Sequence, residues 1–234
     1  MTNFLHGIEI IEVDSGGRTI TTPSTSVIGI VGTAPLANAE NFPLNKPILI
    51  TSIQDIIALK LGDEGTLPSA LYSVYNQTSA ICVVVRVEEA LEDSTDATRN
   101  SQLDMEQTLK NLAGDVAKYT GVYALALAET ETKYKPKLLV CPYYSSIPTE
   151  DNKPNAIVAA LLDMAEKLRG VAIIDGTNTT RSDAIDFASQ IGNARAMIID
   201  PAYKPSFNST ESTLSASPLM AGIFAKNDAT KGFW

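Results

Sequence analysis

The chain has 234 residues, of which 44% are hydrophobic and 19% charged, and its formal net charge is −9. A chain of this length buries one good-sized core or two small ones. The acidic balance argues against a protein that binds nucleic acid through its phosphates, and against an anionic membrane surface as partner.

Neither export nor membrane insertion is predicted from the sequence. The N-terminus lacks a basic flank followed by an apolar stretch, so we expect no signal peptide. No apolar run reaches the ~18 residues of a membrane span. Cys82 and Cys141 both lie inside apolar runs, which favours buried free thiols over a disulfide and fits a reducing compartment, or a particle assembled in one.

Residues 1–24 are interpreted as an extended arm ahead of a globular body. Two β-prone runs, residues 8–13 and 18–22, flank a Gly-Gly turn and predict a hairpin or a pair of extended segments. The first run is apolar on both faces, so it lies between two partners or contains a bulge. The apolar residues assigned to this inter-subunit arm are Phe4, Leu5, Ile8, Ile10, Ile11, Val13 and Ile20.

The body, residues 25–202, alternates predicted strands with predicted helices. Strands are expected at 26–32, 46–52, 80–88, 135–143, 171–176 and 194–201. Helices are expected at 53–62, 67–77, 105–114, 123–131, 155–170 and 182–192, the last capped by Ser182. The polar segment 91–102 is interpreted as a mobile loop. Strands separated by helices predict an α/β fold with a mostly parallel sheet and flanking helices.

The last region, residues 203–234, is interpreted as a linker and a helix that lead into a C-terminal domain not present in the sequence. The helix has an apolar face, and an aromatic pair follows it. We expect these residues to pack against that domain, and they are Leu219, Ile223, Phe224, Phe233 and Trp234.

A search for catalytic chemistry gives little. The only histidine is His6 in the arm, whereas nucleophilic catalysis needs its base held rigidly beside the nucleophile. One histidine and two separated cysteines leave no zinc-ligand spacing. Residues 29–34, GIVGTA, superficially resemble a dinucleotide loop but lack the third glycine, and Pro35 follows. No catalytic residue, cofactor or metal is therefore predicted.

Two carboxylates are the remaining candidates for a site. Asp175 and Asp200 each follow a predicted strand, at the edge where such sheets usually bind ligands. They could bind a metal, but such carboxylates more often cap loops and helix N-termini. An α/β enzyme with a site near these two residues thus rests on fold class alone.

Several segments resemble contractile phage tail sheath proteins, in the short form of P2-like phages and contractile bacteriocins. They are residues 4–20, 24–35, 42–51, 135–145 and 221–234, which together run along nearly the whole chain. The resemblance implies a subtilisin-like middle region, here without a protease triad because the body contains no histidine. It also implies a further C-terminal domain beyond the equivalent of Trp234, which meets the tail tube.

The resemblance implies a structural subunit, not an enzyme, that polymerises helically around a tail tube and contracts to drive the tube through the target cell envelope. The implied partners are other sheath subunits, the tube protein through the missing C-terminal part, the baseplate and the tail terminator. The implied location is the virion tail or a phage-tail-like particle, assembled in the host cytoplasm. Another self-assembling shell protein is the alternative within the structural class.

The length of the arm suggests how such subunits connect. About 22 extended residues span roughly 70 Å, whereas a compact body of about 210 residues is roughly 45 Å across. The arm can therefore reach a neighbouring subunit and add strands to its sheet. We expect residues 1–22 to make few contacts with their own body.

Overall fold

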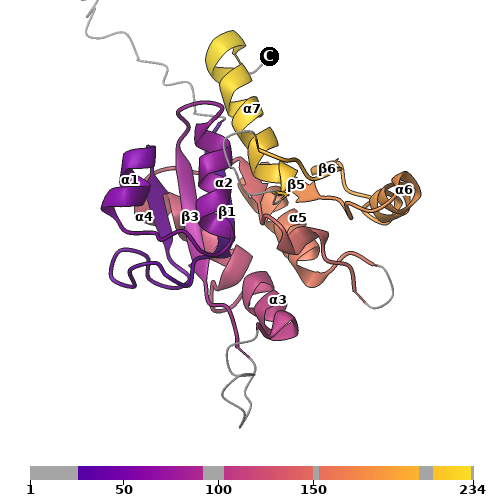
Figure 1. The fold of residues 1–234 in the computed structure, drawn as a ribbon, viewed down its shortest axis with the longest axis horizontal. Helices are drawn as coiled ribbons and strands as arrows, with labels where there is room; N and C mark the ends of the chain where they lie inside the picture. The colour runs from indigo at the N-terminus through magenta and orange to yellow at the C-terminus, as the bar shows by residue number, and fades with distance from the viewer. Residues whose placement is uncertain (1–25, 92–102, 150–152, 206–212, 233–234) are drawn as a thin grey trace, which may run out of the picture.

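The computed structural model describes residues 26–91, 103–149, 153–205 and 213–232. The described residues form a six-stranded sheet with helices on both faces (Figure 1). The arm, most of the polar segment 91–102, and Phe233 and Trp234 lie outside the described residues, so the predictions that concern them stay predictions.

The strand order in the sheet is β2-β3-β1-β4-β5-β6. Only β2 runs antiparallel to its neighbour β3, and the other neighbouring pairs are parallel. The predicted α/β class with a mostly parallel sheet is therefore confirmed. The strands are β1 (Ile28–Thr33), β2 (Pro47–Ile50), β3 (Cys82–Val87), β4 (Leu138–Val140), β5 (Val171–Asp175) and β6 (Ala196–Ile199).

The helices follow the predicted order along the chain. The α-helices are α1 (Ile53–Ala58), α2 (Thr66–Tyr75), α3 (Met105–Ala113), α4 (Ala128–Thr132), α5 (Ala156–Leu168), α6 (Arg181–Ser189) and α7 (Ala216–Lys231). Two 3₁₀ segments, η1 (Gly121–Leu127) and η2 (Tyr144–Ser146), complete the described elements. Among the described residues, no helix has the length and apolar character needed to cross a membrane.

Three predicted helices differ in their bounds. The helix expected at 53–62 stops at Ala58, because Lys60 takes a left-handed backbone with φ of 57°. The expected helix 123–131 is the 3₁₀ segment η1 followed by the short α4. Helix α6 begins at Arg181 and is capped by Thr180, whose side chain accepts a hydrogen bond from the Asp183 backbone N–H, so the cap assigned to Ser182 is wrong.

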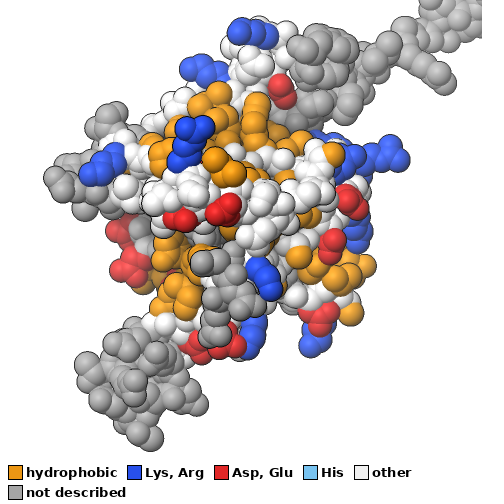
Figure 2. Space-filling view, turned by 90° about the vertical axis from the view of Figure 1, so that its right-hand side faces the viewer, with side chains coloured by type: hydrophobic (Ala, Val, Ile, Leu, Met, Phe, Trp, Pro, Cys, Tyr) orange, Lys and Arg blue, Asp and Glu red, His pale blue; other side chains and the backbone are white. Residues whose placement is uncertain are grey.

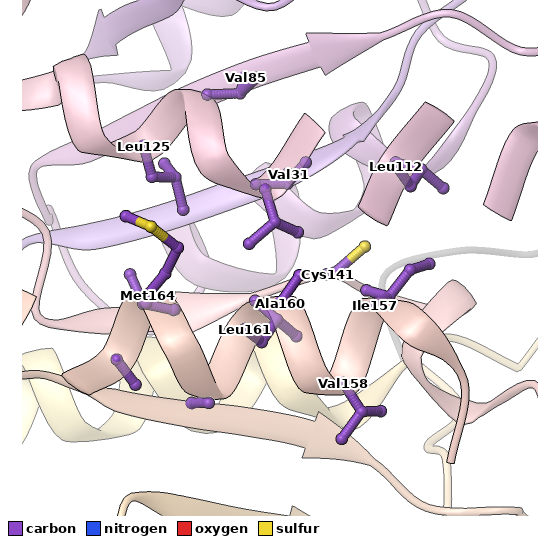
Figure 3. Close-up of a cluster of buried hydrophobic side chains, with 14 of the residues drawn as sticks. Val31, Val85, Leu112, Leu125, Cys141, Ile157, Val158, Ala160, Leu161 and Met164 are labelled. Carbon is purple, nitrogen blue, oxygen red and sulfur yellow. The ribbon is translucent and has the colours of Figure 1, made fainter. Parts of the chain in front are cut away.

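The hydrophobic core has two layers, one on each face of the sheet. On the first face, α5 packs with η1 and α3 against strands β1 and β3 (Figure 3). Leu161 and Met164 of α5 lie toward Val31 and Leu125 in this layer, and all four are at most 1% exposed. Helix α5 begins where the Asn155 side chain accepts hydrogen bonds from two backbone N–H groups of the first turn.

On the second face, α1, α2 and α7 cover the sheet, and α7 lies directly against α2 (Figure 1). Small residues of α7 make this contact: Ala221, Gly222 and Ala225 are buried. The predicted apolar face is therefore not the face that α7 buries deepest, because Leu219 and Phe224 are half-buried and Ile223 is 40% exposed. Close approach of two helices selects small side chains rather than large ones.

A substitution at Gly222 can test the close packing of α7 against α2. A Cβ atom at this position would lie 3.1 Å from the Val74 Cα and carbonyl oxygen of α2. We expect Gly222→Leu to lower the free energy of unfolding by about 1–3 kcal/mol, because overpacking outweighs the helix propensity gained. Ala229→Leu, at an exposed position near the C-terminal end of α7, is the matched control and should leave the melting temperature nearly unchanged. Equal melting temperatures for the two variants would contradict the packing of α7 on α2.

Candidate functional site at the carboxyl edge of the sheet

The parallel strands β1, β4, β5 and β6 all end at one edge of the sheet, where ligand sites of open α/β sheets lie. Asp175 is the last residue of β5, and its side chain faces the start of α7. Asp175 is 5% exposed. The chemistry of this edge therefore depends on which groups donate hydrogen bonds to this buried carboxyl.

Hydrogen bonds from three elements satisfy the Asp175 carboxyl. Its Oδ1 accepts a bond from the Ser217 backbone N–H at 2.8 Å. Its Oδ2 accepts bonds from Ser217 Oγ at 2.7 Å and from the Tyr143 N–H at 3.3 Å, and Ser145 Oγ lies 3.5 Å away. Asp175 thus caps the first turn of α7 and fastens it to the loop after β4. The capping alternative from the sequence is the one observed.

Burial raises the pKa of Asp175 above its ordinary value, and the hydrogen bonds from Ser217 and Tyr143 oppose that shift without cancelling it. A raised pKa is common at functional sites, but structural networks produce it as well. At Asp175 every partner belongs to a turn or a helix end. The arrangement therefore positions the backbone at the start of α7 and in the loop after β4.

Asp200 has a separate role on the neighbouring strand. It is exposed, and its Oδ2 accepts a hydrogen bond from the Asn178 N–H at 2.7 Å. Its side chain lies over Gly176, where a Cβ atom would come within 2.6 Å of Oδ2. Asp175 therefore positions the start of α7, whereas Asp200 positions the loop that contains Asn178. Within the described ranges, no group of three or more His, Cys, Asp or Glu residues is placed to bind a metal ion.

The glycines of the GIVGTA segment lie in β1 and allow close packing. A Cβ at Gly32 would lie 2.5 Å from Thr66 Oγ1, and a Cβ at Gly29 would lie 2.9 Å from Pro136 Cβ. Thr33 and Thr66 also join β1 to the start of α2, since the N–H of each donates to the hydroxyl of the other. These glycines therefore serve the packing of β1, and no phosphate loop forms around them.

Cys82 and Cys141 are both buried and free, as the sequence predicts. Burial raises the pKa of the Cys82 thiol to about 12 and also raises the pKa of Cys141. Both thiols therefore stay protonated at neutral pH and are not reactive nucleophiles.

The surface gives a further indication of partner class. On the side of the molecule that carries α6, acidic and basic side chains are interspersed, and hydrophobic side chains gather between them (Figure 2). A nucleic-acid site would show a continuous basic area instead. This face suits contacts with other proteins.

One feature of this edge escaped the sequence prediction. Tyr143, directly after β4, has φ of 68° and ψ of −55° and is 51% exposed. A positive φ normally favours glycine, so the sequence gives no signal of this conformation. Asn155, by contrast, precedes an apolar helical run and carried the usual signal of a helix cap.

The whole chain is similar to tail sheath proteins. It is 33% identical over 239 residues to the tail sheath protein of Escherichia phage P2, covering 100% of this chain and 57% of that protein. It is 34% identical over 235 residues to a putative prophage major tail sheath protein of Pseudomonas aeruginosa strain UCBPP-PA14, covering 99% and 56%. The chain thus spans just over half the length of these curated relatives. No family model matches the chain.

Solved structures share the fold. A chain of the anti-feeding prophage baseplate superposes with a TM-score of 0.56 at 19% identity, over 99% of this chain and 55% of that one. A chain of the sheath complex of an extracellular contractile injection system, PVC, in its contracted state, superposes with a TM-score of 0.59 at 16% identity, over 99% and 52%. The solved structures show that the fold is shared, and the sequence similarity to the phage and prophage proteins places the chain in the contractile tail sheath family. Within it, the chain is similar to the sheath proteins of P2-type phages and prophages.

Proposed function

We propose that the protein is the structural subunit of a contractile tail sheath, which polymerises helically around a tail tube and contracts to drive the tube through a target cell envelope. The observation that carries this proposal is the similarity to the P2 tail sheath protein, which extends over the whole chain. The location that follows is the tail of a virion or phage-tail-like particle, assembled in the bacterial host cytoplasm.

The role is structural rather than enzymatic. The buried carboxyl that an enzyme would use, Asp175, is occupied by hydrogen bonds from its own chain. The only histidine, His6, lies in the arm and not in the body. The α/β body therefore acts as a rigid block that neighbouring subunits contact, and the free energy of contraction comes from repacking these contacts.

The arm supplies the links between blocks. Residues 1–24 carry apolar side chains on both faces of an extended run, a pattern suited to lying between two partners. Strand addition to a neighbouring subunit satisfies backbone groups on both chains. Such a tether lets bodies rotate against one another without separating, as a sheath that shortens and widens requires.

The C-terminal part of the chain is the junction to a further domain. The relatives are longer than this chain, which covers 57% of the P2 protein and 56% of the Pseudomonas one. We assign residues 203–234 as the linker and helix that lead to that domain, with Leu219, Ile223 and Phe224 on the body side of the junction and Phe233 and Trp234 beyond. The domain would contact the tube, and the ends of the sheath would meet the baseplate and the tail terminator.

Electron microscopy and sedimentation test the proposal. The chain joined to a C-terminal region such as its relatives carry should build striated cylinders, because both the arm and the surface that receives it are then present. The 234-residue chain alone should sediment as a monomer or a weak oligomer. Long cylinders from the 234-residue chain would show that this part alone carries the polymerising surfaces, and no cylinders from either form would refute the sheath function.

A further inference from the structure

Tyr143 forms the centre of a strained turn at the carboxyl end of β4. Its φ of 68° and ψ of −55° combine with a hydrogen bond from the Tyr144 N–H to the Pro142 carbonyl oxygen at 2.8 Å. These three residues make a γ-turn of the rare, strained form. Glycine adopts this backbone at little cost, whereas a side chain with a Cβ does not.

Hydrogen bonds from neighbouring polar groups hold the turn in place. The Tyr143 N–H donates to Asp175 Oδ2 at 3.3 Å, and the Tyr143 carbonyl accepts a bond from Ser146 Oγ at 2.7 Å. On the next residue, Asn155 Nδ2 donates to the Tyr144 carbonyl at 2.7 Å. Strained residues persist only where their surroundings fix them in this way, and they gather at functional positions.

The ring of Tyr143 contributes little to its own fold. It is 51% exposed, and within the described part of the chain its ring makes an edge contact with Tyr144 at a centroid distance of 5.2 Å. Tyr144, by contrast, is 2% exposed, and its hydroxyl lies 3.4 Å from Thr33 Oγ1. Of two adjacent tyrosines, one fills the core and the other is held outward.

Among the described residues, those that line the hollow beside Tyr143 are uncharged. The ring borders a hollow of about 150 Å³, and none of the residues that line it carries a charge. They are Thr66, Ser69, Ala70, Ser73, Pro142, Tyr143, Thr213, Leu214, Ser215 and Pro218. In a chain of net charge −9, two copies repel each other at long range, so an uncharged surface is where they can meet at low electrostatic cost. The centres of protein interfaces are depleted of charged residues and enriched in tyrosine.

We propose that Tyr143 is an anchor through which one copy of this chain contacts a second copy, with the uncharged hollow beside it as part of the same contact. This inference rests on the proposed polymerisation. The strained turn fixes the backbone before contact, which lowers the entropy lost on association. Tyrosine is one of the residue types enriched at interface hot spots.

The test compares stability with self-association in the same variants. Tyr143→Gly relieves the turn and removes the ring. We expect its melting temperature, measured on the unassembled 234-residue chain, to stay the same or rise by a few degrees. In the chain joined to its C-terminal region, the critical concentration for assembly should rise about thirtyfold, the loss typical of a hot spot. Tyr143→Phe keeps the ring and should assemble within about threefold of wild type.

Tyr119 is the matched control. It also has a positive φ, 53°, and is 41% exposed, but its ring lies 5.5 Å from Lys167 Nζ within its own chain. Tyr119→Gly should leave assembly unchanged. Unchanged assembly of Tyr143→Gly, or a fall of several degrees in its melting temperature, would overturn the inference while the proposed function stands. A wild-type chain that never self-associates would overturn both.

Discussion

When residues 1–22 are deleted from the chain joined to its C-terminal region, we expect polymerisation to be lost. In the proposed function the arm joins a subunit to its neighbour, so we expect its removal to turn a tethered contact into a free encounter between bodies. Tethering raises apparent affinity by on the order of 10²–10⁴ without any new contact in the body. We therefore expect the critical concentration to rise at least a hundredfold, beyond the range in which cylinders form. Sedimentation of the two forms at equal concentration measures this.

The arm itself can be tested one face at a time. Ile8→Lys with Ile10→Lys charges one face of the extended run, and Ile11→Lys with Val13→Lys charges the other. Because the run is apolar on both sides, each pair should weaken assembly strongly.

Thr2→Lys with Asn3→Lys adds the same charge outside the apolar run and is the control. Loss of assembly in only one of the two pairs would mean that the arm rests on a single surface. Normal assembly in both pairs, or in the deletion, would refute the role of the arm.

The strands and helices that sequence predicted best are those whose pattern is decided locally. Strand β3 was predicted from an apolar run centred on Val83, Val84 and Val85, a pattern typical of a strand buried on both faces. Helix α5 was predicted from an apolar face with 3.6-residue spacing over residues 155–170. In both elements the side chains that set the pattern are the ones the core buries.

The features that sequence missed depend on contacts between distant residues. The buried face of α7 centres on Gly222, because α2 lies within van der Waals distance of it. The residues around Gly222 in the sequence do not indicate that α2 packs against it. Likewise, Tyr143 takes a glycine-like backbone because Asp175, 32 residues away, accepts its N–H. Size and hydrophobicity indicate burial, but they do not indicate which surface approaches most closely.

Asp175 is the residue of the body whose loss should cost the fold most. Asp175→Ala removes the acceptor for the Ser217 and Tyr143 backbone N–H groups and leaves buried donors unpaired. We expect the free energy of unfolding to fall by about 3 kcal/mol and the melting temperature by about 10 °C. Asp200→Ala, at the neighbouring strand end but exposed, is the control and should cost less than about 1 kcal/mol. Equal losses in the two variants would contradict the capping role of Asp175.

Asp175→Asn separates the charge of Asp175 from its shape. The amide of Asp175→Asn keeps one acceptor oxygen but directs an NH₂ group at donors. The stability of this variant should therefore lie between that of wild type and that of Asp175→Ala. The folded state raises the pKa of Asp175 above its unfolded value of 3.8. The stability that comes from protonating Asp175 is therefore fully present below pH 3.8, and it is lost as pH rises through the folded pKa. Wild type should therefore gain stability relative to Asp175→Asn as pH falls from 7 toward 4. Paired thermal unfolding at the two pH values measures this gain, and a difference that shrinks on acidification would mean that the buried carboxyl is stabilised as the anion.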